Sequence, residues 1–292
     1  MNDIKLAVIG GDIRMIYCAK KLAECGFEVS FCGFDCAAPD CGDAVRCRTV
    51  KDAVKGAAAV ILPVPYSQDG CRINAPFSCT DIRIDEALDA VTPTQLVLAG
   101  VCPPGFIEKA EARLLSVIDY MKDEELTVKN AIPTAEGALE LAMKELPVTV
   151  HGTKTLVSGY GRVGKAVSAA FSALHSSVTV CARHGDALAW AKATGYYTAD
   201  MKEICRAVRD KDVIINTVPA LIFDNNVLSF AGKETLIIDL ASVPGGVDFE
   251  AAERLGLKAI HALSLPGKVA PKTAGENIAD AVISVMRKKG VL

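Results

Sequence analysis

Three glycines at the spacing of a dinucleotide-binding turn lie near the middle of this 292-residue chain. The turn is Gly159-Tyr160-Gly161-Arg162-Val163-Gly164. It follows an apolar run from Thr155 to Ser158 and precedes a helical pattern from Lys165 to Leu174. In such a turn the first glycine allows a tight bend, the second lets backbone approach a pyrophosphate, and the third lets the helix pack on the strand. Free amides at the helix start then face phosphate, so the sequence predicts a nicotinamide dinucleotide site.

The next predicted strand, Val178 to Cys181, is followed by Ala182-Arg183-His184 and not by an acid. A carboxylate here would accept hydrogen bonds from the ribose 2′-hydroxyl of NAD. A guanidinium pairs instead with the 2′-phosphate of NADP. We therefore expect NADP and assign Arg183 to its binding. NAD is the alternative if Arg183 is a solvated charge and Asp186 contacts the ribose.

Polar residues also follow the two later strands of this half. Asn216-Thr217-Val218-Pro219 ends one strand, and Asp239 and Ser242 follow the other. Ligands of open α/β sheets bind at the carboxyl ends of the strands, so we expect these six residues to contact the cofactor near its nicotinamide and ribose. Gly245 and Gly246 would allow close backbone approach. The alternative for this segment is ordinary turn chemistry.

Strands and helices alternate along the whole chain, which is typical of an α/β fold with parallel sheets. The expected strands are Lys5–Ile9, Glu28–Cys32, Ala58–Leu62, Leu96–Ala99, Ser116–Tyr120, Thr155–Ser158, Val178–Cys181, Val213–Asn216, Leu236–Leu240 and Lys258–Ala262. The expected helices include Met15–Cys25, Ile82–Val91, Pro104–Leu114, Ala131–Leu146, Asp186–Ala193, Met201–Val208 and Thr273–Lys289.

We expect two Rossmann-like domains with a cleft between them. Residues 1–130 would form an N-terminal substrate and catalytic domain, and 131–275 an NAD(P)-binding domain that opens with an interdomain helix at 131–150. Residues 276–292 would form a C-terminal helix that packs back on the N-terminal domain. The loop from Pro63 to Thr80 is long for a compact domain, which favours a functional role.

Composition excludes several classes of partner. The formal charge is -3 and the basic residues are dispersed, so we expect no nucleic-acid binding. No apolar run approaches the roughly 20 residues that span a bilayer. The first residues lead into a short strand and not into a signal peptide, so we expect a cytoplasmic protein.

Eleven cysteines are present. No CxxC pair or zinc-like cluster is among them, so reduced thiols packed as small apolar groups are expected and no metal is predicted. The spacing of Cys32, Cys36, Cys41 and Cys47 offers a weaker metal alternative.

Several segments together resemble the family of dipicolinate synthase A subunits. They are Val8–Arg14, Ile132–Gly137, the turn at 159–164, Asn216–Pro219, Asp239–Gly246 and Leu265–Gly275. The resemblance covers essentially the whole chain, with wider kinship to 2-hydroxyacid and alanine dehydrogenases. It implies oxidation of dihydrodipicolinate, or of its hydroxytetrahydro precursor, to dipicolinate in sporulation, with NADP as hydride acceptor. It also implies a flavoprotein-like partner, the B subunit, in a heteromeric complex, and we expect a homo-oligomer.

Such a reaction needs cationic anchors for a dianion and one base. Gly11, Asp12 and Arg14 follow the first strand and open a helix, where amides and a guanidinium suit a carboxylate. Alternatively, Asp12 merely caps the helix and Arg14 lies on its exposed face. Lys268 and Lys272 flank a loop that leads to Thr273 at a helix start. Either ammonium could bind substrate, and Lys272 could act as the base.

Glu136, in the first turn of the interdomain helix, is a second candidate proton acceptor, and its alternative role is charge complementarity with the helix dipole. His261 is expected near the cleft, with a satisfied core histidine as the alternative. Two other functions stay open. One is a non-catalytic nucleotide-binding assembly subunit, and the other is a 2-hydroxyacid or amino-acid dehydrogenase.

Overall fold

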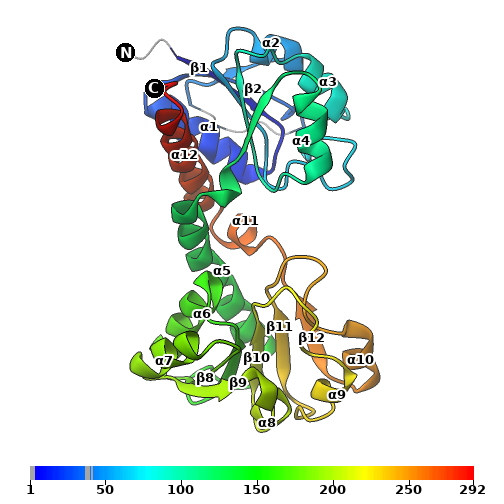
Figure 1. Cartoon of the computed structure of the whole chain (residues 1–292), viewed down its shortest axis with the longest axis vertical. Helices are drawn as coiled ribbons and strands as arrows, with labels where there is room; N and C mark the ends of the chain where they lie inside the picture. The colour runs from blue at the N-terminus through cyan, green and yellow to red at the C-terminus, as the bar shows by residue number, and fades with distance from the viewer. Residues whose placement is uncertain (1–3, 37–39, 41) are drawn as a thin grey trace. The chain divides into compact units, whose positions relative to one another are not determined.

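The computed structural model describes residues 4–36, 40 and 42–292. The chain divides into two compact units. Unit 1 comprises Met1–Lys129 and Ala270–Leu292, and unit 2 comprises Asn130–Val269. Each unit is described below by itself (Figure 1).

Unit 1 is built on a six-stranded parallel sheet with the order β3-β2-β1-β4-β5-β6. Numbered along the unit, this is the 3-2-1-4-5-6 order of dinucleotide-binding Rossmann domains. The strands are β1 (Lys5–Ile9), β2 (Glu28–Cys32), β3 (Val45–Arg46), β4 (Ala59–Ile61), β5 (Leu96–Ala99) and β6 (Ser116–Asp119).

Helices bury both faces of this sheet, as a parallel sheet requires. Leu6 and Val8 pack in the core beneath α1 (Ile13–Glu24) and α12 (Pro271–Lys288), which lie side by side (Figure 1). Ala7 and Ile9 point to the opposite core, under the remaining helices. Those helices are α2 (Val50–Val54), α3 (Ile84–Asp89) and α4 (Pro104–Glu111). A single 3-10 turn, η1 (Tyr120–Lys122), follows β6.

Unit 2 repeats the same strand order, β12-β11-β10-β7-β8-β9, in a second six-stranded parallel sheet. Its strands are β7 (Lys154–Ser158), β8 (Ser177–Ala182), β9 (Tyr197–Asp200), β10 (Val213–Asn216), β11 (Leu236–Asp239) and β12 (Lys258–His261). The predicted fold class, two Rossmann-like α/β domains with parallel sheets, is confirmed.

Helices again cover both faces of the unit 2 sheet. One core lies under α5 (Glu124–Glu145), α6 (Arg162–Ala173), α7 (Gly185–Ala193) and α11 (Leu265–Val269). The other lies under α8 (Ile204–Ala207), α9 (Asn225–Leu228) and α10 (Phe249–Arg254). A 3-10 turn, η2 (Met201–Glu203), precedes α8.

Two of the expected elements were wrong in their bounds. The helix expected from Ala131 begins at Glu124 and carries Pro133 in its interior, where the Thr134 hydroxyl donates to the Asn130 carbonyl at 2.7 Å. Glu136 is therefore mid-helix and not in a first turn. The segment from Pro266 to Pro271 was expected as a loop, but the short helix α11 covers it as far as Val269.

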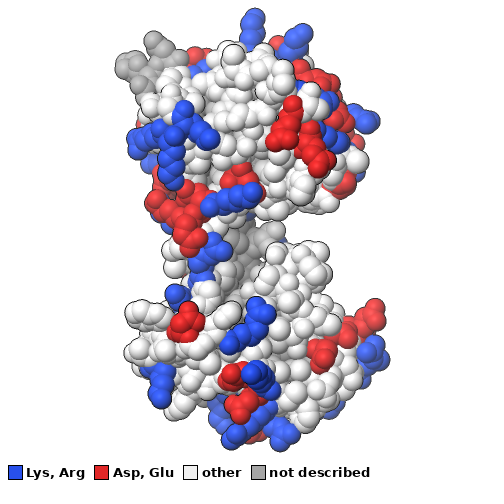
Figure 2. Space-filling model, in the orientation of Figure 1, with Lys and Arg blue, Asp and Glu red and all other residues white. Residues whose placement is uncertain are grey.

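Basic and acidic side chains are interspersed over the face shown in Figure 2, as the nearly balanced composition suggests.

The expectation that all thiols are reduced was wrong for one pair. Cys36 and Cys79 form a disulfide because the fold brings their Cα atoms to 5.7 Å across 43 residues of sequence. Within the described ranges, no helix is long and apolar enough to cross a bilayer.

Candidate functional site

The three glycines of the turn between β7 and α6 have different roles. Gly159 adopts φ +86, and a Cβ there would lie 2.6 Å from Thr217 Oγ1. A Cβ on Gly164 would lie 2.3 Å from the Gly159 carbonyl oxygen, so the helix packs on the turn at a distance that only glycine permits. A Cβ on Gly161 would meet nothing within 4 Å. The first and third glycines thus serve the fold, whereas the second faces open space.

The first turn of α6 follows Gly161 directly. Gly161 is the N-cap, and no side chain forms a capping hydrogen bond. The amides that lead the helix, those of Val163 and Gly164 among them, therefore lack a capping side chain. Uncapped amides at the positive end of a helix dipole favour an anion such as a pyrophosphate.

Both candidates for ribose recognition lie just beyond β8. Arg183 is the first residue after the strand and is exposed. Asp186 is exposed in the first turn of α7. Among the described residues, neither side chain forms an ion pair, so a 2′-phosphate and a ribose hydroxyl each have an available partner.

A buried polar network joins the ends of three neighbouring strands, β7, β10 and β11. Asn216 lies at its centre with no exposed surface. Its Oδ1 accepts hydrogen bonds from Ser158 Oγ at 2.6 Å and from Val218 N at 3.0 Å. Its Nδ2 donates to Asp239 Oδ1 at 2.7 Å and to the Val218 carbonyl at 3.0 Å. Every polar atom of this amide is used within the protein.

Asp239 is likewise 0% exposed. Besides Asn216, its carboxylate accepts from Ala241 N at 3.0 Å and from Gly246 N at 2.7 Å. Within the part of the chain that the structure describes, no cation pairs with it. Its charge is stabilised by three neutral N–H donors. Both buried side chains therefore hold the loops after β10 and β11, and the outward-facing groups of these loops are their neighbours.

Those neighbours are accessible. Thr217 is half-buried, with its hydroxyl donating to the Ser158 carbonyl at 2.7 Å. Pro219 and Ser242 are exposed. Gly246 serves packing within the loop, since a Cβ there would lie 2.4 Å from Asn216 Nδ2. His261 matches the alternative expected for it, because its Nε2 lies 3.1 Å from the Ala241 carbonyl and its ring stacks on Phe249.

In unit 1, Gly10 and Gly11 turn the chain at the carboxyl end of β1 with φ of +64 and +111. Asp12 caps α1 by accepting from Arg14 N at 3.0 Å, as the alternative for Asp12 proposed. The alternative for Arg14 was wrong, because this residue is only 8% exposed. Its Nε and Nη2 donate to the Asp12 carboxylate at 2.9 and 2.7 Å, and Nη2 also donates to the Val64 carbonyl at 2.6 Å. No hydrogen bond joins Nη1 to any described residue, so the N–H groups of Nη1 remain available to another acceptor.

The first turn of α12 begins close to this arginine. A Cβ on Gly275 would lie 2.3 Å from the Arg14 carbonyl oxygen, so the two helices meet backbone to backbone. Lys272 and Thr273 lie within about one helical turn of that contact and are exposed. Lys272 Nζ is 3.9 Å from Glu276 Oε1, a weak surface pairing. Unit 1 thus brings together Gly11, Asp12, Arg14, Lys272 and Thr273.

Glu136 and Lys268 belong to unit 2, and both are exposed, Lys268 in the last turn of α11. The described residues include no group of three or more His, Cys, Asp or Glu side chains placed to hold a metal ion. Cys41, one of four cysteines considered for a metal, lies outside the described residues. Ser158 was not predicted as a site residue, although its place at the end of a glycine-turn strand was a usable signal.

Three comparisons with known proteins agree on one family. Residues 5–121 match the family model of the N-terminal domain of the dipicolinate synthase A subunit. The chain is 33% identical to the dipicolinate synthase A subunit of Bacillus subtilis strain 168 over 98% of this chain and 97% of that protein. It is also similar to the crystal structure of the dipicolinate synthase A subunit from Bacillus halodurans, with 32% identity, coverage of 97% and 98%, and a TM-score of 0.90.

A more distant likeness concerns the fold alone. The transhydrogenase of Sinorhizobium meliloti is 16% identical with a TM-score of 0.72, covering 97% of this chain and 92% of that one.

Proposed function

This chain belongs to the family of dipicolinate synthase A subunits, and from that premise we propose that it oxidises dihydrodipicolinate, or its hydroxytetrahydro precursor, to dipicolinate in sporulation. Aromatisation of the dihydropyridine removes a hydride and a proton from the ring, and the hydroxytetrahydro precursor must first lose a molecule of water. When NADP is bound, it supplies the hydride acceptor. The protein must hold the dianion, orient the ring and accept the proton.

The observation that carries this proposal is the open face of the 159–164 turn. Gly161 leaves room for a pyrophosphate, and the uncapped amides of α6 offer it donors. Thr217 and Ser242 are the accessible polar groups of the two loops beyond it. Asn216 and Asp239 act here as positioning residues for those loops.

Arg183 is the residue proposed to select NADP. Calorimetric titration of the R183Q variant should show NADP affinity reduced about ten- to a hundred-fold, the range for loss of a charge-assisted hydrogen bond, with NAD affinity unchanged. K192Q removes a lysine from the same helix region and is the matched control. Unchanged affinity for both nucleotides would favour the alternative, in which Arg183 is solvated and Asp186 contacts the ribose, and an equal loss for both would mean that Arg183 does not select the 2′-phosphate.

The substrate dianion is proposed to bind in unit 1. Asp12 and the Val64 carbonyl hold the Arg14 guanidinium, and Nη1 then donates to one carboxylate. Lys272 provides the second cationic partner, and the Thr273 hydroxyl is a further candidate donor to the substrate. The candidates for the proton acceptor are Lys272, in place of its cationic role, and Glu136.

The reaction is tested by NADPH formation at 340 nm from freshly generated dihydrodipicolinate, with and without a flavoprotein-like B subunit. Turnover by the chain alone supports a self-sufficient dehydrogenase. Turnover only with the partner supports a site shared between subunits. NADP binding without turnover in either mixture supports the assembly role, and turnover of 2-hydroxy or amino acids would redirect the proposal to that class.

The K272Q variant separates the two roles proposed for Lys272. A base contributes typically 10²- to 10⁴-fold to the chemical step, so kcat should fall by that range if Lys272 accepts the proton. A raised KM at unchanged kcat would assign it to carboxylate binding alone.

A further inference from the structure

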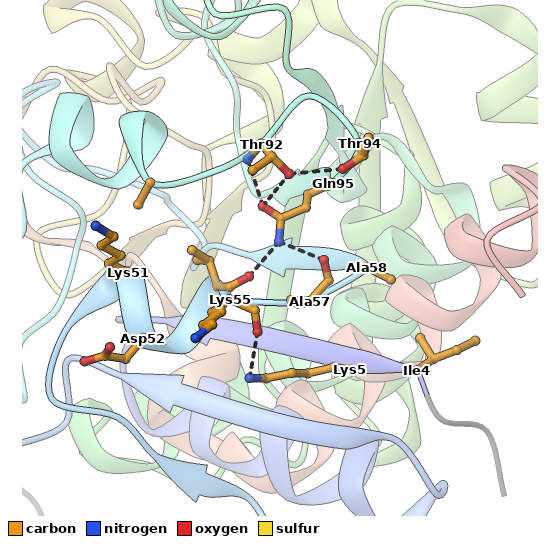
Figure 3. Close-up of a pocket in the computed structure, with 13 residues that line it drawn as sticks. Ile4, Lys5, Lys51, Asp52, Lys55, Ala57, Ala58, Thr92, Thr94 and Gln95 are labelled. Carbon is orange, nitrogen blue, oxygen red and sulfur yellow. Dashed lines mark hydrogen bonds between the residues drawn. The ribbon is translucent and has the colours of Figure 1, made fainter.

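A hollow of about 750 Å³ lies in unit 1 at the opposite edge of the sheet from Arg14 (Figure 3). It opens where β1, β4 and β5 begin, whereas the residues proposed for catalysis lie where strands end. Its lining is Ile4, Lys5, Lys51, Asp52, Val54, Lys55, Gly56, Ala57, Ala58, Ala90, Thr92, Thr94 and Gln95. Its volume falls within the range of about 300–1,000 Å³ typical of small-molecule sites.

The charges around the hollow are unbalanced, with three lysines against one aspartate. None of the three ammonium groups has a carboxylate within 4.0 Å among the described residues. Lys5 Nζ donates a 2.8 Å hydrogen bond to the Lys55 carbonyl, and its other N–H groups remain available to a ligand. Lys51 and Lys55 are four residues apart at α2, a spacing at which like charges repel. The Asp52 carboxylate accepts a hydrogen bond from the Thr49 hydroxyl at 2.6 Å.

The floor of the hollow is braced by one side chain. Gln95 is 6% exposed. Its Nε2 donates to the carbonyls of Val54 at 2.6 Å and Ala57 at 2.7 Å, and its Oε1 accepts from Thr92 N at 2.8 Å (Figure 3). This bracing joins the chain before β4 to the chain before β5, so the concavity is set by hydrogen bonds inside the fold.

The remaining lining adds two kinds of surface. The Thr92 hydroxyl donates to Gln95 Oε1 at 3.2 Å and lies 3.1 Å from the Thr94 hydroxyl, so these polar groups brace the rim of the hollow. Ile4, Ala58 and Ala90 contribute apolar wall. Cations from two elements and an apolar wall together match an anion that carries an apolar body better than they match a bare inorganic ion.

We propose that this hollow is a second ligand site, which binds a small organic dianion with an apolar body, such as an aromatic dicarboxylate. The unpaired ammonium groups of Lys51 and Lys55 bind the carboxylates and the apolar wall packs against the body. The proposal is independent of the reaction proposed above, because it concerns the opposite edge of the sheet.

The test is calorimetric titration of the full chain with benzene-1,3-dicarboxylate at low salt. The K51Q/K55Q double variant should lose at least about ten-fold in affinity at one site. K289Q, which removes an exposed lysine elsewhere in unit 1, should bind like the parent. A thermal melt of each variant controls for folding.

Affinity should also fall when sodium chloride is raised from about 50 to 500 mM, since exposed charges are screened. Sulfate titrated in place of the dicarboxylate should bind more weakly. Equal affinity of the parent and the double variant overturns the proposal, as does an absence of binding or sulfate binding as tight as that of the dicarboxylate. Binding that survives in K51Q/K55Q belongs to the other edge of the sheet and counts against the hollow.

Discussion

Adding one methyl group to the 159–164 turn should have opposite effects at Gly161 and at Gly164. At Gly164 the new Cβ would lie 2.3 Å from the Gly159 carbonyl oxygen and 2.9 Å from its carbon. Both distances are too short for a Cβ contact, so α6 must shift away from the turn. Overpacking of this kind costs about 1–3 kcal/mol, offset by about 1 kcal/mol of helix propensity. The net destabilisation is therefore about 0–2 kcal/mol, and we expect the upper end for G164A because the clashing atoms belong to the backbone of Gly159.

At Gly161 the same methyl group would meet no atom within 4 Å, and the backbone φ of -81 is one that alanine adopts freely. We therefore expect the free energy of unfolding of G161A to lie within about 0.5 kcal/mol of that of the parent, the usual range for a surface substitution. The methyl group occupies the space that a pyrophosphate must approach. NADP affinity should fall at least about ten-fold with no loss of stability.

Urea unfolding without nucleotide and calorimetric titration with NADP measure the two effects separately. G185A is the matched control, since Gly185 opens α7 in the same unit and its Cβ would also meet nothing within 4 Å. Parent-like NADP binding by G161A would refute the assignment of this turn to the pyrophosphate. Parent-like stability of G164A would refute the packing argument.

Three further outcomes follow from buried and charged groups. Asp239 accepts three N–H hydrogen bonds, and D239N replaces one of its acceptor oxygens by an NH2 group that faces an N–H donor. The free energy of unfolding should therefore fall by about 1–3 kcal/mol; an unchanged urea midpoint would show that the network is dispensable. Burial raises the pKa of Cys102 to about 12, so at pH 8 roughly one thiol in 10⁴ is a thiolate, and iodoacetamide should modify exposed Cys71 first by peptide mass spectrometry; equal rates would contradict this. The hydrogen bond from the Leu126 amide, together with the Lys288 ammonium, lowers the pKa of the Asp123 carboxyl. The stability that Asp123 contributes is therefore present above about pH 4 and is lost as pH falls through its lowered pKa in the folded state. In urea titrations the parent should lose more stability than D123N between pH 7 and 3, and parallel losses would rule out a contribution from Asp123.

Much of the secondary structure was predictable because central parallel strands are continuous apolar runs. The bounds expected for β1, β2, β5 and β10 agree with the structure. The strands missed were β3 and β9. Each lies at the edge of its sheet and is largely exposed, so neither carries a buried pattern. The short helices α2, α9 and α10 were missed for a similar reason, since they span too few residues to show a period.

The start of α5 shows a different limit of local reasoning. Pro133 favoured a helix beginning just before it, because proline is tolerated in a first turn and disfavoured later. In the structure the helix runs through the proline, and the Thr134 hydroxyl bonds the Asn130 carbonyl one turn earlier. Packing of the helix on both sides of the proline overrides the local preference.

By itself, the sequence determined the glycine turn, the alternation of strands and helices, and the polar residues at strand ends. Each of these depends on residues within about one turn or strand of one another. Only the tertiary structure decided how those polar residues pair. The Arg14 guanidinium is shared with Asp12 and Val64, Asn216 is buried against Asp239, Cys36 meets Cys79, and three lysines without carboxylate partners among the described residues surround one hollow. Apart from Asp12, which is two residues from Arg14, the paired residues are distant in sequence. Strand order sets their distances, so no local pattern could have placed them.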